Sequence, residues 1–328
     1  MTDFPMAEKI SLPERKGSRG SVIAPIDLAV YGAGSGPTVV LCHGFPEIGY
    51  SWRYQIPALA EAGFRVIVPD QRGYGASDAP DAVEDYTLEH LTSDLVGILD
   101  HYEIEKAVFA GHDWGGFVVW CMPLAFPDRT AGVIGVNTPF MPFPGTSLLR
   151  ETFSNDEDLY ILWFQQEGIA EGVMDSRARL VFEKNMRGGI RTRRGMLSPD
   201  GPKRKANFFI DLETRKAAGP EILSEAELNH YIEVYQRTGF RGGINWYRNI
   251  DKNFDLYPEM GKKKLDLPCL MVTAEWDFAL SPSLADGMPQ VCSDLEMHMI
   301  EKCGHWTQQE KPEELNRIMT HWLRERFL

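Results

Sequence analysis

Short apolar runs alternate with amphipathic stretches over the first 140 residues of the chain. Four of these runs predict buried strands at 37–44, 65–70, 106–112 and 132–139. Helical spacing of Leu, Val, Phe and Ile predicts helices at 87–102 and 117–126. Because strands that alternate with helices are joined by right-handed crossovers, the pattern predicts a mostly parallel sheet with helices on both faces.

The same alternation returns near the end of the chain. Residues 268–277 and 295–306 predict strands, and 311–326 has the spacing of an amphipathic helix. Between 141 and 255 the composition shifts to Arg, Lys, Glu and aromatic residues at helical spacing. We therefore expect one α/β core, formed by 1–140 and 256–328, with a helical cap inserted at 141–255. Within that insertion, 187–205 is expected to be a solvated loop.

Composition narrows the range of partners. The 328 residues are 43% hydrophobic and 25% charged, which is typical of a globular protein with a sizeable core. The formal net charge is −13, and a surface of this sign repels phosphate backbones and anionic lipid headgroups. We therefore expect neither a nucleic acid nor a membrane as a partner.

Cysteine usage and the first residues bear on the cellular compartment. The five cysteines are scattered and lack C-x-x-C spacing, which favours reduced thiols over disulfides or a zinc site. The charged stretch 1–17 does not look like a signal peptide, and no apolar run reaches the roughly 18 residues of a membrane helix. The expectation is a cytoplasmic protein without a metal or other cofactor.

The stretch AGHDWGG, residues 110–116, is typical of a sharp turn from a strand into a helix. Gly111 and Gly115 flank Asp113 at a distance of two residues on each side, and Gly116 follows. Small residues are needed there because bulk would clash with a strained nucleophile, and the following helix favours a charged carboxylate. The alternative is a glycine-rich turn in which Asp113 only caps the helix.

A second motif, His43-Gly44-Phe45-Pro46, follows the first strand predicted to be parallel. Backbone N–H groups from such a loop form an oxyanion hole together with the N–H of the residue after the nucleophile. The predicted donors are the backbone N–H groups of Phe45 and Trp114. The alternative is a tight turn that needs Gly and Pro for its geometry alone.

Candidates for a base and its orienting acid follow the last two predicted strands. His305 lies in GHW at 304–306, and Glu275 and Asp277 lie in AEWD at 274–277. The order Asp113, Asp277, His305 reproduces the chain order of nucleophile, acid and histidine in α/β-hydrolase triads. Because the strand that ends at Asn137 offers no acid, Asp277 is the preferred orienting residue.

A carboxylate at the nucleophile position changes the chemistry that is expected. A serine that attacked a saturated carbon would form an ether, which the enzyme could not cleave. An aspartate forms an ester, which water activated by a histidine can hydrolyse. Asp113 therefore points to substitution at sp³ carbon, and epoxides and alkyl halides are the substrates that fit. Opening an epoxide needs a proton donor, for which a phenol is suited, whereas halide release does not.

At this point the sequence resembles the epoxide hydrolases of the α/β-hydrolase fold, which include the soluble enzymes of animals and bacteria. The matching segments span nearly the whole chain: HGFPEIGYSWRYQ (43–55), GHDWGG (111–116), NTPF (137–140), DLYILWFQQEGIAE (158–171), FRGGINWYRN (240–249), MVTAEWDF (271–278) and CGHWTQ (303–308).

The resemblance implies an activity and a set of site residues. In this family two tyrosines of the cap reach the epoxide oxygen, and the matching positions are Tyr160 and Tyr247. It implies that Asp113 forms a covalent hydroxyalkyl ester, that the His305–Asp277 pair activates water, and that the product is a vicinal diol. The substrate pocket is expected to include Trp114, Phe45, Trp163 and Met141.

Three other functions remain open at this stage. A haloalkane or haloacid dehalogenase would use the same aspartate and histidine but should lack the two tyrosines. A serine esterase is disfavoured because G-x-S-x-G does not occur in the chain. A binding module on this fold should have lost a catalytic residue, and all the expected ones are present. The sequence does not decide whether two copies form a homodimer.

Overall fold

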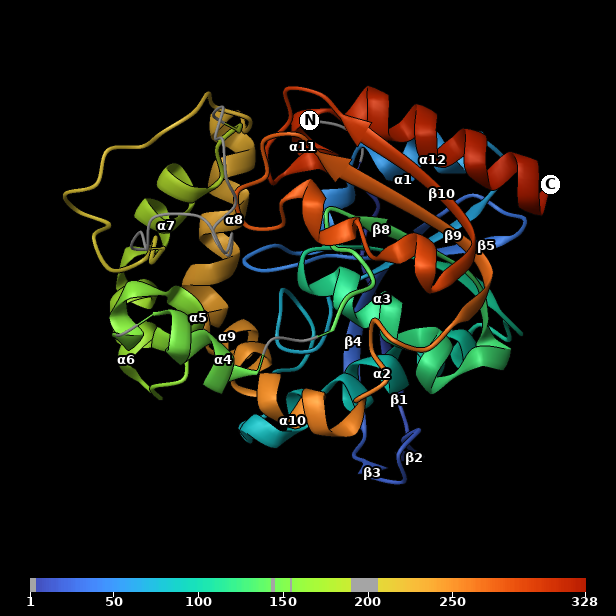
Figure 1. Cartoon of the computed structure of the whole chain (residues 1–328), viewed down its shortest axis with the longest axis horizontal. Coiled ribbons are helices and arrows are strands. Elements are labelled where there is room, and N and C mark those ends of the chain that lie inside the picture. Colours follow the sequence, from blue (N-terminus) through green and yellow to red (C-terminus); the bar gives the residue numbers. More distant parts are fainter. Residues whose placement is uncertain (1–3, 143–144, 154, 190–205) are drawn as a thin grey trace.

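An eight-stranded sheet is the centre of the fold. The structure is a computed structural model that describes residues 4–142, 145–153, 155–189 and 206–328. The strand order is β1-β4-β6-β5-β7-β8-β9-β10, and the pairs from β6 to β10 are parallel (Figure 1). The strands of this sheet are β1 (Glu8–Leu12), β4 (Ile26–Ala33), β5 (Thr38–Cys42), β6 (Arg65–Pro69), β7 (Ala107–His112), β8 (Thr130–Val136), β9 (Leu265–Ala274) and β10 (Cys292–Ile300).

The strands expected from the sequence are present. Their bounds agree to within three residues, except that the last strand, expected to end at 306, ends at Ile300. β1 and β4, which pair antiparallel with each other and through β4 with β6, were not expected from the sequence. A two-stranded ribbon of β2 (Arg15–Lys16) and β3 (Val22–Ile23) lies between them in the chain. The mostly parallel sheet is thus confirmed, with one antiparallel edge.

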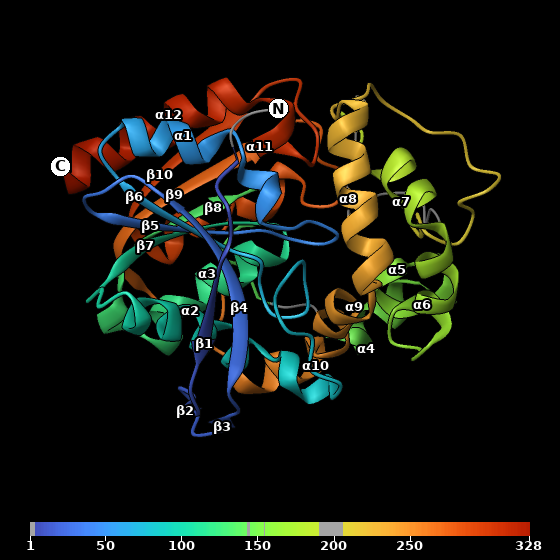
Figure 2. The same cartoon turned by 180° about the vertical axis from the view of Figure 1, so that it is seen from behind.

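Helices cover both faces of the sheet. The described residues include α1 (Gln55–Glu61), α2 (Leu88–His101), α3 (Trp114–Ala125), α4 (Thr146–Thr152), α5 (Tyr160–Trp163), α6 (Ile169–Met174), α7 (Ala178–Asn185), α8 (Glu225–Thr238), α9 (Arg241–Arg248), α10 (Ile250–Leu256), α11 (Thr307–Glu310) and α12 (Pro312–Phe327). In Figures 1 and 2, α1 and α12 lie on one face of the sheet, and α2 and α3 lie on the other.

The core consists of two layers that the sheet separates. Successive residues of a strand point to opposite faces, so Val39 and Leu41 pack with α1 and α12, whereas Val40 packs with α2 and α3. The central strands β5 and β7 are therefore buried along their whole length. This explains why they appear in the sequence as continuous apolar runs rather than as alternating ones.

Helices α4 to α10 fill the chain between β8 and β9. Helices α4 to α9 lie together beside the sheet, on the side where β9 and β10 end, whereas α10 lies beneath the core, where Asn253 accepts from the backbone N–H of Leu88 in α2 (Figures 1 and 2). Most of the expected loop at 187–205 lies outside the described residues. In the part of the chain that is described, no helix is both long enough and apolar enough to cross a membrane.

Candidate active site

Polar side chains converge where parallel strands end. Asp113 directly follows β7, Asp277 follows β9 by three residues and His305 follows β10 by five. The loop that begins at His43 follows β5, which pairs with β7. Because the carboxyl ends of parallel strands share one edge of the sheet, residues far apart in the sequence meet at one place.

The turn after β7 holds Asp113 in a strained backbone conformation. Its φ of 52° and ψ of −122° lie in a region that residues with a side chain rarely adopt, at a cost of about 1–3 kcal/mol. Close packing maintains this conformation. A Cβ on Gly111 would lie closer than 3.0 Å to the backbone of Gly115, and a Cβ on Gly115 would lie that close to Cys42. Gly111 and Gly115 are therefore required because the turn leaves no room for a side chain at either position.

The carboxylate of Asp113 faces both the predicted oxyanion loop and the predicted base. The backbone N–H of Phe45 donates to Oδ1 over 2.9 Å, and Nε2 of His305 lies 3.7 Å from Oδ2. Trp114, the second predicted donor, is the first residue of α3. The hydroxyl of Thr138 donates to the backbone carbonyl oxygen of Asp113 over 2.7 Å, and this hydrogen bond stabilises the turn.

Of the two candidate acids, Asp277 lies next to His305. Its Oδ2 accepts from Nδ1 of His305 over 2.9 Å and from Nδ2 of Asn137 over 2.6 Å. Burial by itself would raise the pKa of Asp277, but the facing imidazole and these hydrogen bonds lower it to about 2. Glu275 is exposed and accepts from the backbone N–H of Lys302 instead.

The two acids determine the protonation of His305. Burial favours the neutral imidazole, but the negative charges of Asp277 and Asp113 outweigh it and raise the pKa of His305 to about 9. At neutral pH the imidazole of His305 is therefore charged.

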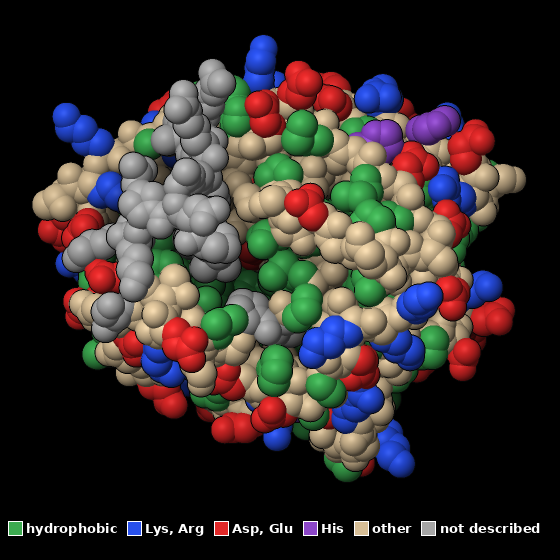
Figure 3. Space-filling model, in the orientation of Figure 1, with side chains coloured by type: hydrophobic (Ala, Val, Ile, Leu, Met, Phe, Trp, Pro, Cys, Tyr) green, Lys and Arg blue, Asp and Glu red, His purple; other side chains and the backbone are tan. Residues whose placement is uncertain are grey.

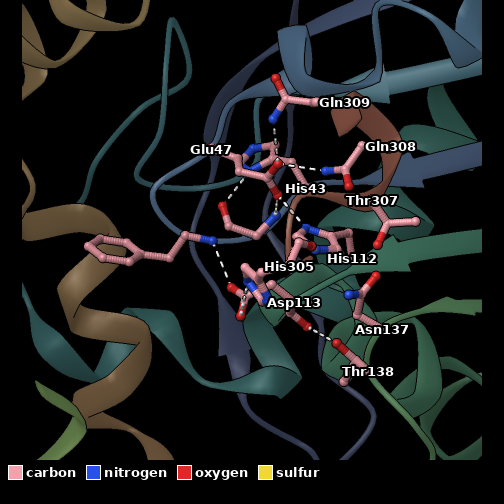
Figure 4. A network of polar contacts seen from close by, with 12 residues as sticks. His43, Glu47, His112, Asp113, Asn137, Thr138, His305, Thr307, Gln308 and Gln309 are labelled. Carbon is pink, nitrogen blue, oxygen red and sulfur yellow. Dashed lines mark hydrogen bonds and ion pairs between the residues drawn. The ribbon is translucent and has the colours of Figure 1, made fainter. Parts of the chain in front are cut away.

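A buried acid that the sequence did not suggest, Glu47, joins the oxyanion loop to the base. Figure 4 shows the network. Oε2 of Glu47 accepts from the backbone N–H of Gly44 over 2.9 Å and lies 2.7 Å from Nδ1 of His112, whose Nε2 lies 2.7 Å from the carbonyl oxygen of His305. Oε1 accepts from the side chains of Gln308 and Gln309. The only sequence signal was proximity: Glu47 follows the Gly44 motif, and His112 precedes Asp113.

Tyr160 and Tyr247 lie together near Asp113 and among aromatic rings. Their ring centroids are 5.7 Å apart, and the ring of Tyr247 lies 5.1 Å from Trp114 and 5.3 Å from Phe45. Burial, together with the negative charge of Asp113, raises the pKa of both phenols, so both stay protonated at neutral pH. On the face shown in Figure 3, hydrophobic side chains gather around a hollow near the middle of the view.

The pocket residues expected from the sequence are not equally close to this cluster. Phe164, which is next to the predicted Trp163, packs against Tyr160, Tyr247 and Phe45. The ring of Trp163 packs against that of Phe164, with the centroids 5.8 Å apart. Met141 is half-buried, and its backbone lies against Gly261. Among the described residues, no three His, Cys, Asp or Glu side chains are grouped as metal ligands.

Known proteins resemble the chain over most of its length. The sequence pattern of the α/β-hydrolase fold matches residues 37–312. Epoxide hydrolase A of Mycobacterium tuberculosis is 41% identical over 297 residues, which cover 88% of this chain and 90% of that protein. Bifunctional epoxide hydrolase 2 of Sus scrofa is also 41% identical and covers 88% of this chain, which spans only 52% of the pig protein.

Solved structures give the same answer for the fold. The crystal structure of epoxide hydrolase A from Mycobacterium thermoresistibile is 37% identical and has a TM-score of 0.80, covering 97% of this chain and 98% of that one. Epoxide hydrolase VrEH1 from Vigna radiata is 29% identical and has a TM-score of 0.79, with 98% of each chain covered.

The packing at the turn leads to a first prediction. Gly115→Ala should lower the free energy of unfolding by about 1–3 kcal/mol, because the new Cβ would overlap the backbone of Cys42. Gly172→Ala is the matched control: nothing lies within 4 Å of its Cβ in α6, and it should be neutral or stabilise the helix by up to about 1 kcal/mol. Urea unfolding measures both. Equal stability of the two variants would contradict the steric account of the turn.

The charge next to His305 leads to a second prediction. Asp113→Asn should lower the pKa of His305 from about 9, because one of the two carboxylates that stabilise the imidazolium is lost. Asp277→Asn should lower it further, because Asp277 makes the larger contribution. Titration of the His305 ring resonances by NMR measures both changes. An unchanged pKa in both variants would mean that the two acids do not control the histidine.

Proposed function

Because the chain belongs to the α/β-hydrolase fold family, and to the epoxide hydrolases within it, we propose that it converts epoxides and water into vicinal diols. The observation that carries the proposal is the placement of the Asp113 carboxylate. It lies between an oxyanion donor, Phe45, and a histidine paired with a second acid. Two phenols with raised pKa lie close by.

In the first step we propose that Asp113 attacks one epoxide carbon. Its carboxylate oxygen forms a C–O bond, the C–O bond of the ring breaks, and the electron pair goes to the epoxide oxygen. Tyr160 and Tyr247 hydrogen-bond that oxygen, and one of them delivers a proton. The product is a hydroxyalkyl ester on Asp113. Raised pKa values suit phenols to this role, because they hold their protons until an alkoxide develops.

In the second step we propose that His305 takes a proton from water, which attacks the carbonyl carbon of the ester. Ester formation removes the negative charge of Asp113, so the pKa of His305 falls and the neutral imidazole becomes accessible as a base. Asp277 keeps the ring oriented. The backbone N–H groups of Phe45 and Trp114 stabilise the oxyanion. Its collapse breaks the ester C–O bond, and the leaving alkoxide takes the hydroxyl proton of the new carboxylic acid, which releases the diol and restores the carboxylate of Asp113. The proton that His305 gave up after ester formation has by then returned to the phenolate of the first step.

We further propose that the helical segment 141–255 acts as a cap. It supplies both phenols, and its helix α8 is fixed to the core by polar contacts. Arg53 donates to Glu227 over 2.7 Å, and the hydroxyl of Tyr235 donates to the carbonyl oxygen of Glu47 over 3.0 Å. The substrate is therefore expected to bind between this segment and the carboxyl ends of the strands, together with water and without a cofactor.

A reducing compartment such as the cytoplasm is proposed on separate grounds. All five cysteines are buried and free, at positions 42, 121, 269, 292 and 303. Free thiols persist where thiol–disulfide exchange keeps them reduced.

The covalent step leads to a third prediction. His305→Gln should form the ester and then stall, because water is no longer activated, so the intact mass should increase by the mass of one substrate molecule. Asp113→Asn, which cannot form the ester efficiently, is the control and should show no adduct. Intact-mass spectrometry after incubation with styrene oxide, with turnover confirmed in the unaltered protein, measures both. A His305→Gln variant that turns over at the unaltered rate would rule out this role of the histidine.

The phenols lead to a fourth prediction. Tyr160→Phe and Tyr247→Phe should each slow alkylation by up to about 10²-fold, because one preorganised donor is lost while the other remains. The double variant should be almost inactive on epoxides, since the alkoxide would be expelled without a proton in apolar surroundings.

Alkyl halides separate this proposal from its main alternative, a dehalogenase. Halide release needs no proton, so any activity on 1-bromobutane should be affected much less by the double substitution. Formation of the ester in single turnover and release of bromide measure the two activities. A double variant that opens epoxides at the unaltered rate would show that the tyrosines only pack.

A further inference from the structure

One carboxylate joins the helical segment to the loop of His305, apart from the groups assigned to the two steps above. The backbone N–H of Gly189 lies 3.1 Å from each carboxylate oxygen of Glu310, and the backbone N–H of Gly304 donates to Oε2 over 2.9 Å. Gly189 follows α7, and Gly304 directly precedes His305. Glu310 therefore holds two distant segments of backbone at one point.

The two glycines approach each other as closely as their backbones allow. A Cβ on either would lie closer than 3.0 Å to the backbone of the other. A second contact supports the junction: the indole N–H of Trp306 donates to the carbonyl oxygen of Asn185 over 2.8 Å. Because glycines contribute no side chain, the polar part of this junction depends on Glu310 and Trp306.

A carboxylate is well suited to this junction. It accepts hydrogen bonds with both oxygens and presents no donor, and a charged acceptor forms stronger bonds with N–H groups than a neutral one. An amide of the same length would keep one acceptor oxygen, but its NH₂ group would face a backbone donor. The half-buried position of Glu310 increases the cost of leaving these N–H groups without an acceptor.

The peptide groups on both sides of His305 are held in place. Glu310 fixes the N–H of Gly304, and the hydroxyl of Thr307 donates to the carbonyl oxygen of Gly304 over 3.2 Å. The carbonyl oxygen of His305 itself lies 2.7 Å from Nε2 of His112. The direction of the imidazole therefore depends on contacts to its own backbone as well as on Asp277.

We propose that Glu310 is a positioning residue for ester hydrolysis: by holding Gly189 against Gly304, it couples the docked helical segment to the orientation of His305. The inference rests on the proposed function, in which His305 activates water only in the second step. Loss of Glu310 should therefore slow hydrolysis of the ester and leave its formation unaffected.

The test is single-turnover kinetics of Glu310→Ala with styrene oxide. The rate of ester decay should fall roughly tenfold, because small misplacements of a base are costly, while the rate of ester formation stays unchanged. In steady state kcat and KM should then fall together, leaving kcat/KM unchanged and more ester accumulated. Glu310→Gln should recover part of the decay rate. Glu313→Ala, which alters an exposed carboxylate nearby, is the matched control and should behave like the unaltered protein.

Gly189→Ala tests the same junction from its other side. Its Cβ would push Gly304 away, so it should reproduce the slow decay of the ester, whereas Gly172→Ala should not. Amide exchange provides a readout that does not depend on activity: the N–H groups of Gly189 and Gly304 should exchange faster in Glu310→Ala than in Glu313→Ala.

The outcomes separate this inference from the proposed function. If the unaltered protein forms no diol from any epoxide, the proposed function fails and the positioning role fails with it. If the unaltered protein is active but Glu310→Ala hydrolyses its ester at the unaltered rate, only the positioning role is wrong. If Glu310→Ala instead has a lower kcat at constant KM, so that kcat/KM falls in proportion, then part of that variant is merely unfolded. The same behaviour in Glu310→Gln would overturn the proposal.

Discussion

The close approach of β5 and α3 is the constraint on which the site depends. Gly115 packs its Cα against the end of β5, and a single additional carbon there would collide with backbone. This contact places the N–H of Phe45 2.9 Å from the carboxylate of Asp113. Two features follow from one contact: Asp113, the proposed nucleophile, is held in a strained conformation, and the N–H proposed as an oxyanion donor is directed at its carboxylate. Strain of this kind persists only where the surrounding structure enforces it.

The charges next to His305 determine how its protonation changes between the two proposed steps. His305 lies between two carboxylates, one of which is consumed in the proposed first step. The two charges raise the pKa of His305 to about 9, which favours an imidazolium in the free site. In the proposed ester intermediate one of these charges is gone, so the neutral imidazole can act as a base. Asp277, with its pKa lowered to about 2, remains charged throughout. In the proposed mechanism, His305 therefore changes from a cation before the ester forms to a base afterwards.

A feature of the fold or of the candidate site could be predicted from the sequence only where it leaves a pattern in neighbouring residues. The buried strands could be predicted, because burial on both faces gives continuous apolar runs. The order of Asp113, Asp277 and His305 could be predicted, because each follows a strand. β1 was missed because it is an edge strand with one exposed face, which leaves a weaker pattern, and β4 was missed although most of it is buried or half-buried. The central role of Glu47 was missed because its partners Gly44, His112, Gln308 and Gln309 come from three segments, which only folding brings together.

The packing of the aromatic side chains around Tyr160 and Tyr247 was harder to predict for a related reason. Trp163 is the last residue of the short helix α5 and Phe164 directly follows it, and sequence spacing does not tell which of them faces Tyr160 and Tyr247. In the structure it is Phe164 whose ring packs against Tyr160 and Tyr247. Helical spacing gives the relative direction of two side chains, but the absolute direction is set by what the helix rests on.

The donor at Phe45 belongs to the main chain, and this affects how the site can change over evolutionary time. Substituting the side chain at that position leaves the N–H in place, so the oxyanion contact is insensitive to most mutations of the residue that provides it. Only changes that move the backbone, such as bulk at Gly44 or Gly115, can remove it. Drift can therefore change the aromatic side chains that are proposed to line the pocket, and with them the molecules accepted, while the contact between the N–H of Phe45 and Asp113 is retained.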